Sequence, residues 1–198
     1  MPRTVSITRE TSETRIRLSV DLDGTGRSTV RTGMGFLDHM LVLLAGHSLY
    51  DLDIDCSGDL HVDGHHSVED VGRSLGTAVR DALGDRRGIR RYGHCVLPMD
   101  ESLVTAAVDL GGRPACVFAV PFPVPVIGTF DVQLVEVFWE GFAAAAGANV
   151  HAVLHHGRNA HHIAEAVFKA LARALRMATE MDPRQTGVPS TKGILTQQ

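Results

Sequence analysis

Two short stretches of this 198-residue chain carry the same set of possible metal ligands. Residues 65–69 read His-His-Ser-Val-Glu, and residues 161–165 read His-His-Ile-Ala-Glu. On a helix, side chains four residues apart project from one face, so the first His and the Glu of each stretch could bind one ion. The second His points about 100° away and is free to bind another ion. The two motifs therefore indicate ligands for a pair of ions.

The donor types limit both the metals and the alternative explanations. Imidazole and carboxylate groups without sulfur suit manganese, iron, cobalt, nickel or zinc. The same residues could instead be polar residues at helix starts, since Glu in a first turn favours the helix dipole. At this chain's His and Glu content, one such pattern is expected about 0.02 times by chance. Two copies therefore favour metal ligation.

A further histidine, His39, interrupts an otherwise apolar segment at residues 36–44. A lone His in such a segment is more often a core residue with satisfied hydrogen bonds. With two metal motifs downstream, however, a helix packed beside them could deliver His39 as another ligand.

The elements that would position these residues follow from hydrophobic periodicity. A helix is predicted over residues 65–83, ended by Gly84, and another over residues 161–177. Residues 14–21 alternate as a half-buried strand, and residues 28–32 are expected to return as the second arm of a hairpin after a turn at 23–26. The other expected elements are apolar helices at 36–44 and 132–146 and strands at 49–56, 102–110, 116–122 and 149–154.

A shift of 96 positions superposes the first motif and its helix on the second. His65 falls on His161, Glu69 on Glu165, and the apolar positions that follow also match. Such an internal repeat predicts an α+β fold of two duplicated halves, each a small mixed or antiparallel sheet covered by helices. The expected units are residues 1–90 and 91–198, with the boundary near residues 88–93.

Composition excludes several classes of partner. The net charge is -4 and basic runs are absent, which argues against nucleic acid as a partner. Neither a signal peptide nor a run of about 18 apolar residues occurs, so no membrane association is expected and a cytoplasmic protein is predicted. Three cysteines lie far apart without a CxxC pair, so we interpret them as packing residues rather than disulfide or metal ligands.

The basic residues are mostly arginine, and Lys169 and Lys192 are the only lysines. Both lysines lie near motif ends or turns, as do Arg91 and Arg113. Each alone would be a solvated surface charge. Beside a metal pair they could clamp an anion, since Arg forks and Lys point charges are the usual means.

Many ordered motifs together resemble the imidazoleglycerol-phosphate dehydratase family over nearly the whole chain. They lie at residues 9–14, 35–40, 63–70, 91–93, 98–101, 112–114, 161–170 and 189–193. The resemblance implies a ribosomal protein S5 domain 2-like fold in both halves. It also implies a homo-oligomeric shell of 24 subunits with two Mn²⁺ ions per subunit, held at subunit contacts.

The resemblance also implies roles for individual residues. One ion would be held by His39, His66, His161 and Glu165, and the other by His65, Glu69 and His162. The substrate would be handled by Glu13, Arg91, Arg113, Lys169, Ser190 and Lys192, the cations and Ser190 mainly binding its phosphate. Ser190 and Lys192 belong to a C-terminal substrate-binding tail.

The implied reaction is a manganese-dependent hydro-lyase step of histidine biosynthesis, from imidazole glycerol phosphate to imidazole acetol phosphate. The proton that is lost has no adjacent carbonyl to acidify it. A substrate imidazolate held between two ions could expel the hydroxyl, the metals acting as template and Lewis acid. Glu13, Glu69, Glu165 or a metal-bound hydroxide could move the protons, and the sequence leaves that choice open.

One position departs from the family pattern. Members commonly carry a further metal-binding His in the helix of the second half, where this chain has Val137. Water, Glu136 or one of His151, His155 and His156 could substitute, or the second site could be weaker.

The alternative to this interpretation is a dinuclear metal protein that is non-catalytic or has a different specificity. It could take two forms. A two-metal hydrolase would hold its ions about 4 Å apart, usually with a bridging carboxylate. A metal-storage or metal-sensing shell would leave the anion-clamping cations without a role. Saturable binding of a phosphorylated imidazole, lost with phosphate-free analogues, would argue against both.

Overall fold

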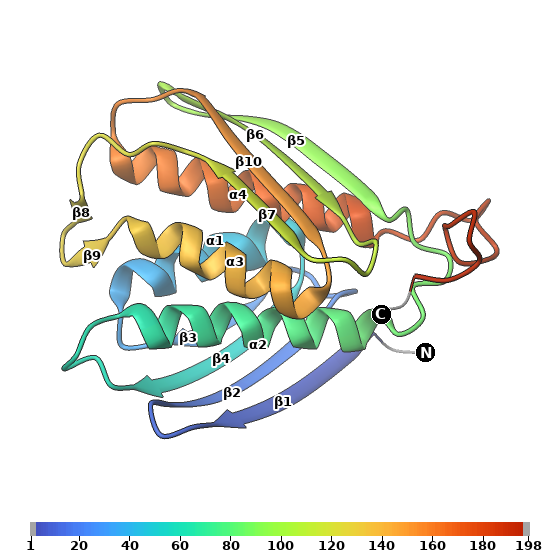
Figure 1. Ribbon diagram of the computed structural model, residues 1–198, viewed down its shortest axis with the longest axis horizontal. Coiled ribbons are helices and arrows are strands. Elements are labelled where there is room, and N and C mark those ends of the chain that lie inside the picture. Colours follow the sequence, from blue (N-terminus) through green and yellow to red (C-terminus); the bar gives the residue numbers. More distant parts are fainter. Residues whose placement is uncertain (1–2, 196–198) are drawn as a thin grey trace.

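The computed structural model describes residues 3–195, which form two four-stranded sheets with helices between them (Figure 1). The elements of the first half are β1 (Thr4–Glu10), β2 (Thr14–Asp21), β3 (Ser28–Arg31), α1 (Gly35–Ser48), β4 (Asp51–Gly58) and α2 (His65–Leu83). Those of the second half are β5 (Tyr92–Met99), β6 (Ser102–Asp109), β7 (Ala115–Ala119), β8 (Val126–Ile127), β9 (Phe130–Asp131), α3 (Gln133–Ala146), β10 (Asn149–His156) and α4 (Ala160–Thr179).

The two halves repeat one arrangement. The strand orders are β1-β2-β4-β3 and β5-β6-β10-β7, and β8 and β9 form a small separate ribbon in the second half. In each sheet the last pair, β3 with β4 or β7 with β10, is parallel, and the other pairs are antiparallel. The predicted fold class, two duplicated α+β halves with mixed sheets, is confirmed.

The hairpin predicted between residues 14–21 and 28–32 is wrong. β3 pairs with β4, Val30 lying opposite Ile54, and the hairpin partner of β2 is β1, which was not expected. The turn at 23–26 does not fold back on β2, because Asp51 at the start of β4 accepts the backbone N–H groups of Thr25 and Arg27 at 2.7 and 2.9 Å. The loop is thereby fixed to β4. Strand β5 was also not expected.

Helices from the two halves exchange partners in the middle layer. Helix α2 covers the first sheet and α4 covers the second, while α1 packs on α4 and α3 packs on α2. The alternating inward residues of β2 and β6 face these helices. Buried apolar residues from both halves belong to one cluster, so the halves share a single core.

Helices α2 and α3 approach each other through glycines. A Cβ atom on Gly72 would lie 2.3 Å from the carbonyl oxygen of Phe138, and one on Gly76 would lie 2.4 Å from that of Phe142. On the facing helix, a Cβ on Gly141 would lie 2.8 Å from the carbonyl oxygen of Glu69. The two backbones are therefore close enough that only glycine fits.

A buried arginine supports the C-terminal end of α3. The side chain of Arg86 is 3% exposed and donates to the carbonyl oxygens of Leu110 and Ala146, both at 2.8 Å. The guanidinium satisfies two buried acceptors that would otherwise lack donors.

Candidate metal centre

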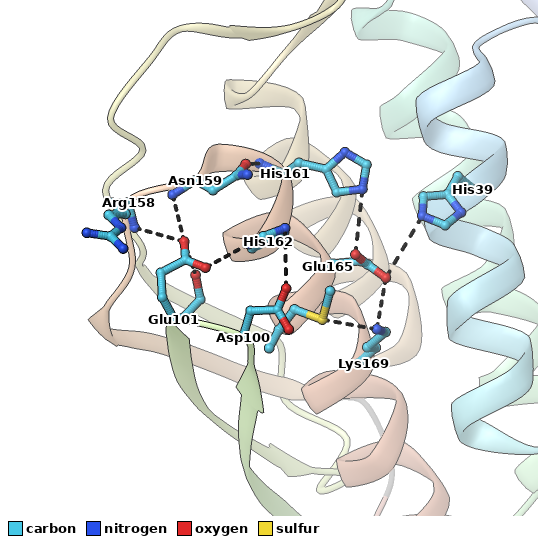
Figure 2. Close-up of polar contacts among 11 residues, drawn as sticks. His39, Asp100, Glu101, Arg158, Asn159, His161, His162, Glu165 and Lys169 are labelled. Carbon is cyan, nitrogen blue, oxygen red and sulfur yellow. Dashed lines mark hydrogen bonds and ion pairs between the residues drawn. The ribbon is translucent and has the colours of Figure 1, made fainter.

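Donor atoms of His39, His161 and Glu165 all lie within 4.8 Å of one another, the one group of three possible metal ligands found in residues 3–195. The Nε2 atoms of His161 and His39 are 3.6 and 3.9 Å from the Glu165 carboxylate (Figure 2). Two imidazole nitrogens and a carboxylate are a donor set that suits manganese, iron or zinc. The residues present therefore fit a metal ion.

Local structure explains why these three side chains meet. The side chain of Asn159 accepts the N–H of His161 at 3.0 Å, which caps α4 and places His161 in its first turn. Glu165, one turn later, projects from the same face. His39 comes from α1, because α1 packs on α4.

A lysine completes the surroundings of Glu165. Lys169 Nζ lies 2.8 Å from Glu165 Oε1, and both side chains are mostly buried. Burial alone would raise the pKa of Glu165, but the hydrogen bond and charge of Lys169 outweigh it, and the pKa lies below its ordinary value. Glu165 is therefore held as a carboxylate, the form that binds a metal.

The second histidine of the motif faces another group of residues, as the helical angle predicted. His162 Nδ1 lies 2.7 Å from Glu101 Oε2, and His162 Nε2 lies 3.7 Å from Asp100 Oδ2 (Figure 2). Both carboxylates come from the turn between β5 and β6. The hydrogen bond raises the pKa of His162 and lowers that of Glu101 to about 2.

His66 has similar surroundings in the first half. Its Nδ1 lies 2.9 Å from Asp59 Oδ2 and its Nε2 lies 3.8 Å from Glu13 Oε1. The hydrogen bond that Asp59 accepts from His66 is the main cause that raises the pKa of His66. Glu13 is positioned because Asp70 on α2 binds both Arg9 and Thr14, which flank the β1–β2 turn.

The chain brings together only part of the expected ligand sets. Of the four residues expected at one ion, His39, His161 and Glu165 meet, whereas His66 lies apart beside Asp59. The residues expected at the other ion, His65, Glu69 and His162, do not form a group in residues 3–195. Glu69 instead pairs with Arg73 at 3.5 Å.

Helix α3 has no histidine at the position that corresponds to His39 of α1. Helices α1 and α3 each have 14 residues, and position by position His39 corresponds to Val137. Val137 and His65 line the same pocket. In the equivalent place of the other half, His39 lies beside His161. The place that the repeat makes equivalent to His39 is thus occupied by a side chain that cannot bind a metal.

A separate groove collects most of the predicted anion-binding residues. Arg91, Arg113, Ser190 and Lys192 line it together. Arg91 is fixed there by Asp109, at 2.7 and 3.0 Å, and by the carbonyl oxygen of Pro189 at 2.9 Å. Within one chain, Lys169 and Glu13 lie in other places, beside Glu165 and His66 respectively.

Sequence reasoning assigned no role to Asp59, Asp100 or Glu101, which contact the motif histidines. In the sequence, Asp100 and Glu101 stand out only as part of a stretch that resembles the family. Glu101 is 61 residues from His162, so no spacing pattern connects them. The one usable signal is the pair of acidic residues itself, directly before the strand predicted at 102–110.

None of the helices in residues 3–195 combines the length and the apolar character needed to cross a membrane.

A duplicated α+β fold that converges imidazole and carboxylate groups, with a cationic groove elsewhere on its surface, defines a candidate metalloenzyme for an anionic substrate. The sequence model of one family, described as imidazoleglycerol-phosphate dehydratase, matches residues 32–175. The chain belongs to the imidazoleglycerol-phosphate dehydratase family, whose members are hydro-lyases of histidine biosynthesis.

Individual relatives agree with this assignment. The imidazoleglycerol-phosphate dehydratase of Rhodopirellula baltica is 61% identical over 193 residues, which cover 98% of this chain and 96% of the relative. That of Acidiphilium cryptum is 57% identical over 196 residues, covering 98% of this chain and 100% of the relative.

Solved structures of the family have the same fold. The Staphylococcus aureus dehydratase superposes with a TM-score of 0.83 at 36% identity, over 90% of this chain and 99% of that one. The Pyrococcus furiosus dehydratase, solved with a bound compound, also gives a TM-score of 0.83, at 35% identity, over 96% of this chain and 100% of that one.

Proposed function

We propose that this chain dehydrates imidazole glycerol phosphate to imidazole acetol phosphate, with Mn²⁺ bound by His39, His161 and Glu165. The observation that carries the proposal is the convergence of these three donors within 4.8 Å. Bound ions would supply Lewis acidity toward the imidazole ring of the substrate, and the imidazolate route expected from the sequence is part of the proposal.

The groove would bind the phosphate group. Arg113 and Lys192 are exposed along it and could meet an anion, and Ser190 lines the same groove. Arg91 is already bound to Asp109, so its main contribution is to fix the groove, with the rest of its charge directed at the phosphate.

Among the candidate proton carriers, the geometry favours Glu13. Glu165 is bound to Lys169 and would be a metal ligand, and Glu69 pairs with Arg73. The Glu13 side chain is 49% exposed and its nearest charged neighbour is His66 Nε2 at 3.8 Å. A carboxylate near an imidazole and open to substrate has the access that a general base needs.

Two ions per subunit would require donors from more than one chain, because His66, His65, Glu69 and His162 do not converge within this one. We therefore propose a homo-oligomer, with the 24-subunit shell as the expected form. The outer face of the second sheet supports self-association, since Val96, Val117 and Val153 are exposed there. The corresponding face of β2 and β4 is lined with arginines and aspartates. The face with exposed valines is the one expected to bury area against another copy.

The second ion site is proposed to be the weaker one in this chain. Val137 lies where the repeat would place a counterpart of His39, and Glu69 is engaged by Arg73.

Since Cys56, Cys95 and Cys116 are unpaired, the chain has no disulfide among its described residues, and we propose that it acts in the cytoplasm.

The direct test is turnover by the purified protein after its metals are stripped. Imidazole acetol phosphate should form from imidazole glycerol phosphate only when Mn²⁺ is restored, and Glu165→Gln should abolish this rescue. Release of inorganic phosphate instead would indicate a two-metal hydrolase. Tight metal binding with neither product would indicate a storage or sensing protein.

A further inference from the structure

The second histidine of each motif has its Nδ1 atom bound to a carboxylate. In the second half the partner of His162 is Glu101, at 2.7 Å (Figure 2), and in the first half the partner of His66 is Asp59, at 2.9 Å. In both cases Nε2 is left on the opposite side of the ring, and no hydrogen bond within residues 3–195 engages it.

The internal repeat does not explain this agreement. Asp59 follows the end of β4, whereas Glu101 lies in the β5–β6 turn, whose counterpart in the first half is the β1–β2 turn. Two different places in the repeated unit thus supply the same contact to equivalent histidines. If the contact were a packing feature inherited through the duplication, equivalent positions of the two halves would supply it.

Glu101 is fixed by more than the histidine. Its Oε1 accepts the backbone N–H groups of Asn159 at 2.9 Å and Arg158 at 3.4 Å, while Oε2 faces His162. Both oxygens are therefore in use, and the carboxylate cannot rotate without breaking several contacts. It ties the β5–β6 turn to the loop that leads into α4.

One feature of Asp59 indicates that the stability of the fold does not explain its position. Its Oδ2 meets His66, but its Oδ1 is buried and has no hydrogen-bond partner within residues 3–195. A buried acceptor without a donor is unfavourable. A role outside folding would account for the residue.

The free side of each ring faces negative charge. His66 Nε2 lies 3.8 Å from Glu13 and His162 Nε2 lies 3.7 Å from Asp100. A cation placed at either Nε2 would have a carboxylate beside it. Such an arrangement, carboxylate to Nδ1–H and metal at Nε2, is the usual support of a metal-binding histidine.

We infer that Asp59 and Glu101 are positioning residues, which accept the Nδ1–H of His66 and His162 and thereby fix each ring with the lone pair of its Nε2 aimed at a metal ion. The inference rests on the metal role in the proposed function. Neither carboxylate is expected to touch the ion or the substrate. Loss of such a partner lowers metal affinity by about 10- to 100-fold.

The experiment measures Mn²⁺ affinity on the metal-stripped, assembled protein, by the electron paramagnetic resonance signal of free Mn²⁺ during titration. Glu101→Ala and Asp59→Ala should each weaken binding by about 10- to 100-fold. Glu101→Gln, whose amide oxygen can still accept the Nδ1–H, should regain part of that affinity. Glu10→Ala, which removes an exposed carboxylate paired with Arg15, is the matched control and should bind as the wild type does.

Melting temperature and assembled mass of the metal-free variants separate positioning from folding. Lower affinity at unchanged melting temperature and mass supports the inference. Because Glu101 also anchors the loop before α4, Asp59→Ala decides the matter if Glu101→Ala does not assemble. Wild-type affinity in Asp59→Ala would then overturn it.

Including His162→Ala separates failure of this inference from failure of the proposed function. If His162→Ala binds Mn²⁺ as tightly as the wild type, His162 is not a ligand and both ideas fail for this half. If His162→Ala loses affinity while Glu101→Ala keeps it, the metal role stands and the positioning role is wrong.

Discussion

Replacing Gly72 with alanine tests the close contact between α2 and α3. In an open helix the change would stabilise the protein by about 1 kcal/mol, since glycine is a poor helix former. Here the new Cβ would lie 2.3 Å from the carbonyl oxygen of Phe138, where ordinary contact begins at 3.4 Å. Helix α3 would have to move by about 1 Å, and overpacking of this kind costs roughly 1–3 kcal/mol.

The second effect should win, because the obstacle is backbone and cannot rotate away. A clash with backbone belongs to the upper part of that range, about 2–3 kcal/mol, so after the gain of about 1 kcal/mol we expect net destabilisation of about 1–2 kcal/mol, or a melting temperature lower by roughly 2–8 °C at equal protein concentration. Gly46→Ala is the control: it lies in α1 with nothing within 4 Å of the added atom and should melt at the same or a slightly higher temperature. A Gly72→Ala protein at least as stable as the wild type would refute the reasoning.

Three further predictions concern single side chains. Val137→His should add a donor beside His65 and raise the amount of Mn²⁺ retained after dialysis; unchanged retention would remove Val137 from the account of the second site. Hydrogen bonds from the backbone N–H groups of Thr25 and then Arg27 hold the pKa of Asp51 below its ordinary value. Its stabilising contribution is thus complete above pH about 4 and is lost as the pH falls further, so Asp51→Asn and wild-type unfolding free energies should converge in acid and differ at neutral pH. Arg86→Met should lower the melting temperature by roughly 5–15 °C, because two buried carbonyl oxygens each lose a donor at a cost of about 1–3 kcal/mol; a shift within 2 °C or so would contradict that.

The sequence predicts well what local periodicity determines. The helix over 65–83 and the strand over 14–21 have the predicted bounds, because each has a regular apolar pattern and a clear stop. The duplicated architecture follows from one repeated motif. The strand order does not: the turn at 23–26 predicts that β3 pairs with β2, but Asp51 binds that turn from β4.

The candidate site divides in the same way. That His161 and Glu165 share a helix face could be predicted from their spacing, and His39 could be named as a candidate because two metal motifs follow it in the chain. That α1 packs on α4, and not on the helix of its own half, depends on the tertiary arrangement. The contacts of Asp59 and Glu101 could not be predicted, because a hydrogen bond between distant residues leaves no periodic trace in the sequence.

The exchange of helix partners between the halves has a consequence for symmetry. A chain containing one repeat could not cover its own core and would need a second copy, and a twofold axis would then make both metal positions identical. Joining the repeats in one polypeptide removes that constraint. His39 and Val137, equivalent in the fold, can therefore differ, and one location can specialise in holding an ion while the other is adjusted independently.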